Sequence, residues 1–245
     1  MSESTFYYLL LGIITFDFAL GRILHYLNRE SSKKPIPKEL EGIYDEEKYA
    51  KSQQYMGEVS RFATLTSTLN FVIIFSAIAF GWFGWLDGFL RNYSPLSLVT
   101  PLLFFGTIYV LTDIISIPFS LYQNFVIEAK YGFNKMTKKT FWLDKLKGLL
   151  LTFIIGGILL GVFVYLVESI GSGFWIYFWA VMVAFTLFAN MFYTSLILPL
   201  FNKLTPLEDG ELKTSIQRYC EKVKFPLKNI FVLDGSKRSS KGNAF

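Results

Sequence analysis

Histidine and cysteine are almost absent from this chain of 245 residues, which has one of each, His25 and Cys220. A single cysteine excludes an intrachain disulfide. A single histidine leaves no His-His zinc site, no Ser-His-Asp set and no close Cys-His pair. No glycine-rich phosphate-binding loop is present either. We therefore expect this sequence, taken by itself, to hold no metal and no catalytic residue, and we interpret both residues as structural.

Charged residues are also scarce, at 18% of the chain, whereas 52% of the residues are hydrophobic and 18% are aromatic. This composition is too apolar for a soluble domain of this length. A helix that crosses a bilayer needs ~20 apolar residues, because each residue rises ~1.5 Å and the hydrocarbon layer is ~30 Å thick. Five stretches meet this requirement, and they predict an all-α bundle with spans near residues 6–27, 62–86, 96–122, 146–167 and 175–200.

The basic residues are distributed unevenly among the loops between these spans. Lys and Arg number seven in residues 28–61, one in 87–95, six in 123–147, none in 168–174 and nine after residue 200. This alternation follows the positive-inside rule, which predicts an N-terminus outside, in a lumen or periplasm, and a cytoplasmic tail. It also explains the net charge of +5. We therefore expect a multi-pass protein whose partner is the lipid bilayer and which binds no nucleic acid.

The third predicted span carries a stripe of polar residues. At about 100° per residue they fall within one arc of about 120°: Asp113, Ser116, Ser120, Asn124 and Glu128. Because a charge at the centre of a spanning helix costs ~2.5–3.5 kcal/mol, such groups usually face protein or water. We interpret the first four, and Asn190 on the fifth span, as candidates that line a hydrated cavity. The alternatives are interhelical hydrogen bonds worth ~0.6 kcal/mol each and, for the aspartate, a buried ion pair with Arg22 or with lysines near the membrane face as candidate partners.

The hydropathy falls after residue 200. We expect a helix over residues 206–221, with Thr205 as its N-cap and Glu208 completing a capping box. A short strand over residues 229–234, a basic loop over 235–242 and the start of another strand at 243 follow. A soluble piece of about 45 residues cannot close a hydrophobic core. We therefore expect residues 1–200 to form the transmembrane domain and residues 201–245 to be the beginning of a cytoplasmic α+β domain, truncated here.

Four segments, read in order, resemble the type I CAAX prenyl endopeptidases, a family of integral membrane zinc metallopeptidases. They are residues 37–62 (PKELEGIYDEEKYAKSQQYMGEVSRF), 124–137 (NFVIEAKYGFNKMT), 198–212 (LPLFNKLTPLEDGEL) and 225–245 (FPLKNIFVLDGSKRSSKGNAF). The resemblance implies five membrane helices, then a cytoplasmic catalytic segment with a zinc-binding HExxH helix, then two further spans. It implies that zinc, held by two histidines and a glutamate, is the cofactor of the full-length protein. None of those ligands lies in this sequence.

The resemblance also implies roles for four residues near the ends of these segments. Asn243 and Ala244 match the family's edge strand, along which a substrate peptide pairs by strand addition. A plain core strand is the alternative. Glu128 and Asn134 match a segment beneath the catalytic domain, where we expect structural bracing. The implied partners are a peptide or protein substrate, prenylated or otherwise membrane-associated, and the remaining C-terminal part of the same protein.

Our leading hypothesis is the N-terminal membrane portion of a zinc metalloendopeptidase that cleaves near the C-terminus of prenylated (CAAX) or other membrane-associated proteins. A polytopic transporter or channel would explain the polar stripe, but it leaves the tail GSKRSSKGNAF unexplained. A non-catalytic membrane scaffold that assembles with another chain is the third hypothesis.

Overall fold

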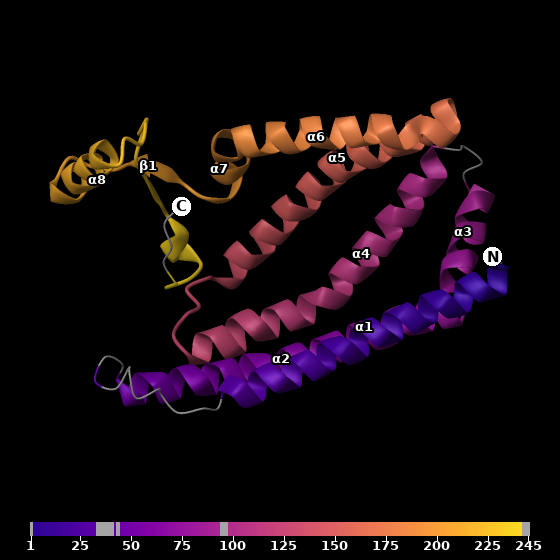
Figure 1. The fold of residues 1–245 in the computed structure, drawn as a ribbon, viewed down its shortest axis with the longest axis horizontal. Helices are drawn as coiled ribbons and strands as arrows, with labels where there is room; N and C mark the ends of the chain where they lie inside the picture. Colours follow the sequence, from indigo (N-terminus) through magenta and orange to yellow (C-terminus); the bar gives the residue numbers. More distant parts are fainter. Residues whose placement is uncertain (1, 33–41, 43–44, 94–97, 242–245) are drawn as a thin grey trace. The chain divides into compact units, whose positions relative to one another are not determined.

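The structure is a computed structural model, and it describes residues 2–32, 42, 45–93 and 98–241. The predicted substrate-binding residues, Asn243 and Ala244, lie outside the described residues. The chain divides into two compact units, Met1–Tyr131 and Gly132–Phe245. Each unit is described by itself below, with the element labels of Figure 1.

The first unit consists of long helices that run back and forth. They are α1 (Glu3–Ser32), α2 (Glu46–Ala79), the short α3 (Trp82–Tyr93), α4 (Val99–Tyr122) and the π-helix η2 (Gln123–Glu128) that continues α4. Figure 1 shows α1 and α2 side by side along most of their length. Phe18 of α1 stacks on Phe71 of α2 with ring centroids 4.1 Å apart. The Tyr7 hydroxyl also donates to the Ala79 carbonyl at 3.1 Å, so the two helices are tied together near the end of α2.

The second unit begins with a helical hairpin. It contains α5 (Lys138–Ile170), the 3-10 turn η3 (Gly171–Gly173), α6 (Phe174–Phe192), the π-helix η4 (Tyr193–Ile197) and α7 (Leu198–Phe201). Gly171 has φ +69°, a left-handed conformation that favours glycine and ends α5. Phe163 packs edge to face against Phe174 and Phe178, with centroids 5.4 and 5.0 Å apart, and these contacts hold the hairpin closed. After α7 come β1 (Leu204–Pro206), α8 (Glu211–Lys222), β2 (Phe231–Leu233) and η5 (Gly235–Lys237).

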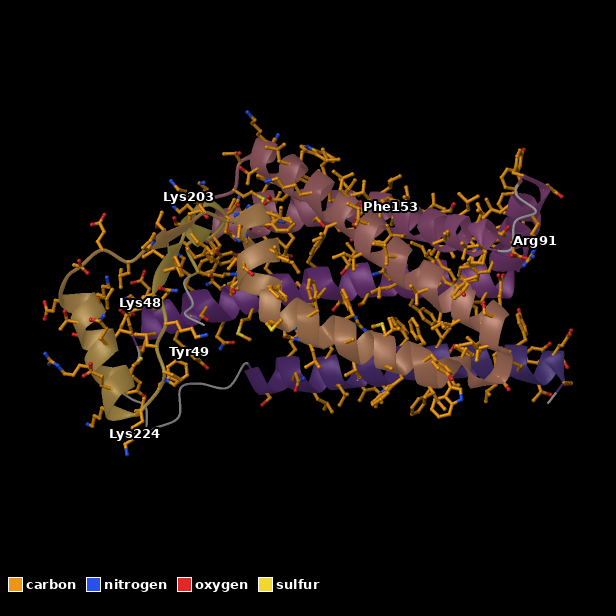
Figure 2. All side chains as sticks on the ribbon, turned by 90° about the horizontal axis from the view of Figure 1, so that it is seen from above. Lys48, Tyr49, Arg91, Phe153, Lys203 and Lys224 are labelled. Atoms are coloured by element: carbon orange, nitrogen blue, oxygen red, sulfur yellow. The ribbon has the colours of Figure 1, made fainter. Side chains whose placement is uncertain are left out.

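Four described helical segments are long and apolar enough to cross a membrane: Glu3–Ser31, Glu46–Ala79, Val99–Glu128 and Lys138–Phe201. The last of them folds back at η3 and therefore contains two long helices, α5 and α6. Apolar side chains on these helices stay exposed, for example Ile158 at 62% and Leu187 at 66%. Figure 2 shows the charged residues Lys48 and Arg91 at opposite ends of the first unit. The predicted fold class, an all-α polytopic membrane bundle, is confirmed.

The second predicted span, residues 62–86, has different ends in the structure. Helix α2 begins at Glu46, because Asp45 caps it by accepting from the N–H groups of Glu47 and Lys48 at 2.9 and 3.1 Å. It ends at Ala79, and Gly81 with φ +68° turns the chain into α3. Residues Trp82–Leu86 are apolar and extend the hydrophobic stretch, although they belong to the next helix, α3.

The helix predicted over residues 206–221 is wrong at its start. Leu204–Pro206 is a strand that pairs antiparallel with Phe231–Leu233, and Thr205 lies opposite Val232 instead of capping a helix. Helix α8 begins only at Glu211, after Gly210. Pairing with a strand far along the chain satisfies the backbone of residues 204–206, and a local capping motif cannot reveal it. The strand predicted over residues 229–234 is confirmed by β2.

Candidate functional site

The side chain of Arg238, in the loop after β2, is held by acceptors from three other residues of the second unit. Its Nε and Nη2 donate to the two carboxylate oxygens of Asp144 at 2.6 and 2.8 Å, which is the planar two-bond pairing that favours arginine over lysine. Its Nη1 donates to Asn202 Oδ1 at 2.8 Å, and Nη2 also donates to the Phe201 carbonyl at 2.6 Å. We call these four residues the Arg238 anchor.

The anchor is half-buried, with 22% of the Arg238 side chain and 20% of the Asp144 side chain exposed. The hydrogen bonds to the Asp144 carboxylate raise the pKa of Arg238 above its already high ordinary value, although partial burial acts in the opposite direction. The guanidinium is therefore always charged. The guanidinium joins the first turns of α5 to the end of α7, so that the loop after β2 is fixed to both of these helices.

Backbone hydrogen bonds fix the same loop to the segment that precedes α5. Asn134 and Ser239 form an isolated antiparallel bridge. The hydrogen bonds around it are Lys135 N–H to Arg238 O at 3.1 Å, Ser240 N–H to Phe133 O at 3.0 Å and Ser240 Oγ to Gly132 O at 3.0 Å. Residues 238–240 are thus held by backbone and side chain together, directly ahead of residues 243 and 244.

Asp234 fixes the other end of this loop. Its carboxylate accepts from the Lys203 N–H at 2.7 Å and pairs with Lys237 Nζ at 2.5 Å, and its own N–H donates to the Lys203 carbonyl at 3.2 Å. The Lys237 ammonium and the Lys203 N–H lower the pKa of Asp234 below 3.8, the ordinary value of an aspartate. The end of β2 is therefore tied to the residue that precedes β1.

A prediction follows for the pH dependence of this turn. Because the pKa of Asp234 is lower in the folded state than in the unfolded state, its stabilising contribution is fully present above about pH 4 and is lost as the pH falls through the folded value. Replacing Asp234 with asparagine should remove about 1 kcal/mol at neutral pH and flatten the acid limb of a thermal unfolding profile. Asp209→Asn, which affects an exposed pair with Lys213, is the matched control and should change little.

The polar stripe lies on the more covered side of α4 and of η2, which continues α4. Asp113, Ser116, Ser120 and Asn124 are half-buried, whereas Leu111 on the other side is 53% exposed. Ser116 Oγ donates to the Asp113 carbonyl at 2.7 Å and Asn124 Nδ2 donates to the Ser120 carbonyl at 2.8 Å. Two side chains of the stripe therefore donate hydrogen bonds to backbone carbonyls of their own helix.

Glu128 ends η2, where the wider turn of a π-helix replaces the 100° spacing assumed for the stripe. Its carboxylate accepts from the Tyr55 hydroxyl at 2.5 Å and from Gln123 Nε2 at 3.2 Å, which joins η2 to α2. Ile127 beside it is completely buried. The structure thus places Glu128 at a helix contact inside the first unit.

The other predicted residues make different contacts, each within its own unit. Asn134 is in the second unit, where its Oδ1 accepts from the Met136 N–H at 2.9 Å and its backbone pairs with Ser239. Asn190 is exposed on α6 and donates to the Thr186 carbonyl at 2.8 Å. Arg22, the candidate partner of Asp113, donates to the Thr64 carbonyl at 3.4 Å and lies 5.5 Å from the ring of Phe18.

The residues of this chain do not fit the zinc that the family resemblance implies. In the part of the chain that the structure describes, no three His, Cys, Asp or Glu side chains are grouped so that they could hold a metal ion. The donor set of the whole sequence, with one histidine and one cysteine, also lacks the two histidines of such a site. No catalytic step is therefore assigned to these residues.

The Arg238 anchor was not predicted from the sequence, although GSKRSS belongs to a segment that carries the family resemblance. The available signal was an arginine in a polar loop together with Asp144 just ahead of an apolar span, since a carboxylate at that depth needs a partner. The separation of 94 residues between them hides the pairing from any local pattern.

These features define a polytopic α-helical membrane protein with a small polar segment anchored to its last helical hairpin. A family model described as the CAAX prenyl protease N-terminal region, with five membrane helices, matches residues 25–203. The chain belongs to this family.

Several known proteins are similar to this chain. The probable CAAX prenyl protease 1 of Schizosaccharomyces pombe is 38% identical over 96% of this chain and 52% of its own length. CAAX prenyl protease 1 of Saccharomyces cerevisiae is 33% identical over 96% of this chain and 54% of its own length. The crystal structure of S. mikatae Ste24p superposes with a TM-score of 0.90 at 32% identity, covering 98% of this chain and 58% of that one. The chain thus spans about half the length of the curated relatives it matches.

Proposed function

We propose that this chain is the N-terminal membrane portion of a zinc metalloendopeptidase that cleaves near the C-terminus of prenylated (CAAX) or other membrane-associated proteins. Membership of the CAAX prenyl protease N-terminal family supports the protease class. The observation that carries the proposal is the Arg238 anchor, which fixes the loop leading to Asn243 and Ala244. A strand that pairs with a substrate needs such a rigid base, because a small misplacement of a bound peptide costs much of the rate.

In this proposal residues 1–200 are the transmembrane domain and residues 201–245 begin the metallopeptidase domain. The ligands of the catalytic zinc lie in a part of the protein outside this sequence, because one histidine and one cysteine cannot form such a site. The alternation of basic loops supports an N-terminus outside and a cytoplasmic tail. Glu128 and Asn134 serve as structural bracing, each within its own unit, since Glu128 bonds η2 to α2 and Asn134 bonds the backbone of Met136.

The test is the coding sequence that follows residue 245. An HExxH motif within about the next fifty residues is the expected result, since this spacing of two histidines and a glutamate on one helix builds the zinc site of a metallopeptidase. A downstream sequence without any such motif would sink the proposal.

We also propose that the polar stripe of α4 lines a hydrated cavity. After replacement of Cys220 by serine, single cysteines at 113, 116, 120 and 124 should react with a membrane-impermeant thiol reagent at least about tenfold faster than cysteines at 111 and 115. The latter two lie on the exposed apolar side and provide matched controls. Equal, slow labelling at all six positions would instead identify the stripe as interhelical hydrogen-bond partners.

A further inference from the structure

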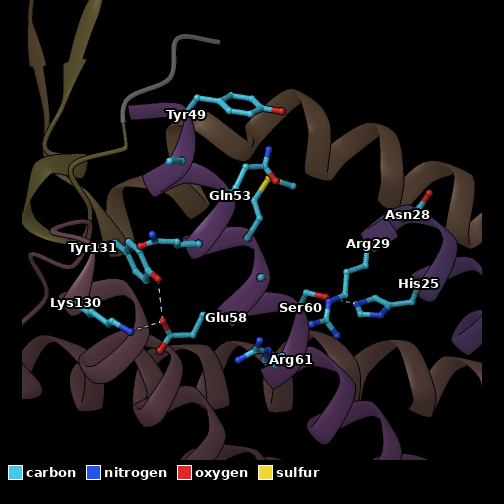
Figure 3. A pocket seen from close by; sticks show the side chains of 14 residues that line it. His25, Asn28, Arg29, Tyr49, Gln53, Glu58, Ser60, Arg61, Lys130 and Tyr131 are labelled. Carbon is cyan, nitrogen blue, oxygen red and sulfur yellow. Dashed lines mark hydrogen bonds and ion pairs between the residues drawn. The ribbon is translucent and has the colours of Figure 1, made fainter. Parts of the chain in front are cut away.

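A pocket of about 970 Å³ lies within the first unit, apart from the Arg238 anchor. It is lined by the last turns of α1, by the first half of α2, and by Lys130 and Tyr131, which follow η2. Figure 3 shows His25, Arg29 and Ser60 gathered on one side and Glu58, Lys130 and Tyr131 on the other, with Arg61 between them. Nothing in the proposed peptidase function uses this pocket.

The lining of the pocket is positively charged. Arg29, Arg61 and Lys130 line it, and Glu58 is its one carboxylate. Glu58 is already occupied, because Lys130 Nζ donates to it at 2.7 Å and the Tyr131 hydroxyl donates at 2.9 Å. Arg61 is exposed and makes no hydrogen bond or ion pair with any residue that the structure describes. The charge of Arg61 also acts on Glu58, but its guanidinium N–H groups stay available to an anion, which the net positive charge of the lining attracts.

The polar groups of the pocket are held in place by the helices around them. His25 Nε2 and Ser60 Oγ are 3.0 Å apart, which joins α1 to α2 at the wall of the pocket. Lys130 also lies 5.5 Å from the ring centroid of Tyr131. The walls thus combine cations, of which Lys130 is held in place, with hydroxyl and amide groups, and this mixture suits a phosphate that carries a polar substituent.

The position of the pocket along the helices indicates where that phosphate comes from. On both α1 and α2 it lies at the boundary where the polar sequence of residues 28–61 meets the apolar spans. Exposed apolar side chains begin within one to two turns of it, with Leu24 and Leu27 on α1 at 51% and 55% and Leu65 on α2 at 54%. This depth corresponds to the headgroup region of a bilayer, so that a lipid with its phosphate in the pocket has its acyl chains against these residues.

We propose that this pocket binds the headgroup of an anionic glycerophospholipid from the adjacent leaflet, with Arg29 and Arg61 as its principal contacts. Such a lipid joins α1, α2 and the residues after η2. It therefore stabilises the first unit at the end where the chain leaves the membrane. The inference stands independently of the proposed peptidase activity.

The experiment measures binding of fluorescently labelled phosphatidylserine to the intact protein in neutral detergent, with labelled phosphatidylcholine as the neutral comparison. Phosphatidylserine should bind more tightly, and Arg61→Gln should weaken it about fivefold while leaving phosphatidylcholine unaffected. The double variant Arg29→Gln/Arg61→Gln should weaken it about 30-fold. The control Lys48→Gln/Lys51→Gln removes two exposed charges of α2 that do not line the pocket and should change binding less than about twofold, as expected of charges at its rim.

Three results would overturn the proposal. Equal losses in the control and in the double variant would show only general attraction to a basic surface. Displacement of the lipid by equimolar inorganic phosphate would identify a site for free phosphate. Unchanged binding in Arg61→Gln, a single exposed substitution that leaves the helix contacts intact, would show that the pocket is not the binding site.

Discussion

Replacement of Arg238 with alanine is expected to lower the free energy of local unfolding of the C-terminal segment by about 2–4 kcal/mol. Removing one partner of a half-buried ion pair leaves the other charge uncompensated. The acceptors that would lose their hydrogen-bond donor are the Asp144 carboxylate, the Asn202 side chain and the Phe201 carbonyl. Hydrogen exchange of the amides of residues 235–241 should accelerate by at least about 30-fold. If the intact protein is a peptidase, its kcat/KM should fall by about 100-fold, since residues 243 and 244 lose their support.

Two further variants separate the anchor from simple loss of charge. Arg238→Lys keeps the charge but loses the planar pair of hydrogen bonds, so it should recover less than half of the lost stability. Lys237→Ala removes the neighbouring cation, which is 64% exposed, and should cost less than about 1 kcal/mol. If the amides of residues 235–241 exchanged hydrogen in Arg238→Ala at the wild-type rate, the anchor would not be what holds this loop.

Replacement of Ile127 with alanine is the second large effect that we expect. Ile127 is fully buried in η2, at the contact between η2 and α2. Truncating a buried isoleucine costs about 2–5 kcal/mol, through lost contacts and the cavity left behind. The intact protein in detergent should therefore unfold at a lower temperature and lose the helix contact that Tyr55 and Glu128 share.

Val126→Ala provides the matched control for this prediction, because Val126 is the preceding residue of the same π-helix and is 44% exposed. It should cost less than about 1 kcal/mol. Equal destabilisation by the two substitutions would mean that the π-helix itself, and not the burial of Ile127, determines stability at this position.

Hydropathy and length were sufficient to predict the membrane helices, because each span must by itself satisfy its backbone and match the thickness of the bilayer. The ends of the helices depend on single residues that the same averages hide. Asp45 caps the N-terminus of α2. Gly81, with its left-handed backbone, ends the turn that follows α2. The π-helix at residues 123–128 was also missed, since an assumed constant turn of 100° cannot reveal a widened one.

The candidate site was less predictable than the fold. Resemblance drew attention to the GSKRSS loop, but the partners of Arg238 come from α5 and from the end of α7, which only the folded chain brings together. The end of β1 was taken for the start of a helix for the same reason, since Thr205 pairs with Val232, 27 residues later. The roles of Asn243 and Ala244 stay a prediction.

Cleavage of a prenylated CAAX peptide by the purified intact protein is the measurement that tests the central claim most directly. We expect cleavage near the peptide's C-terminus that is lost on treatment with a metal chelator, restored by zinc and reduced about 100-fold by Arg238→Ala but not by Lys237→Ala. Absence of cleavage by the folded protein, or cleavage that the chelator leaves unchanged, would contradict the account.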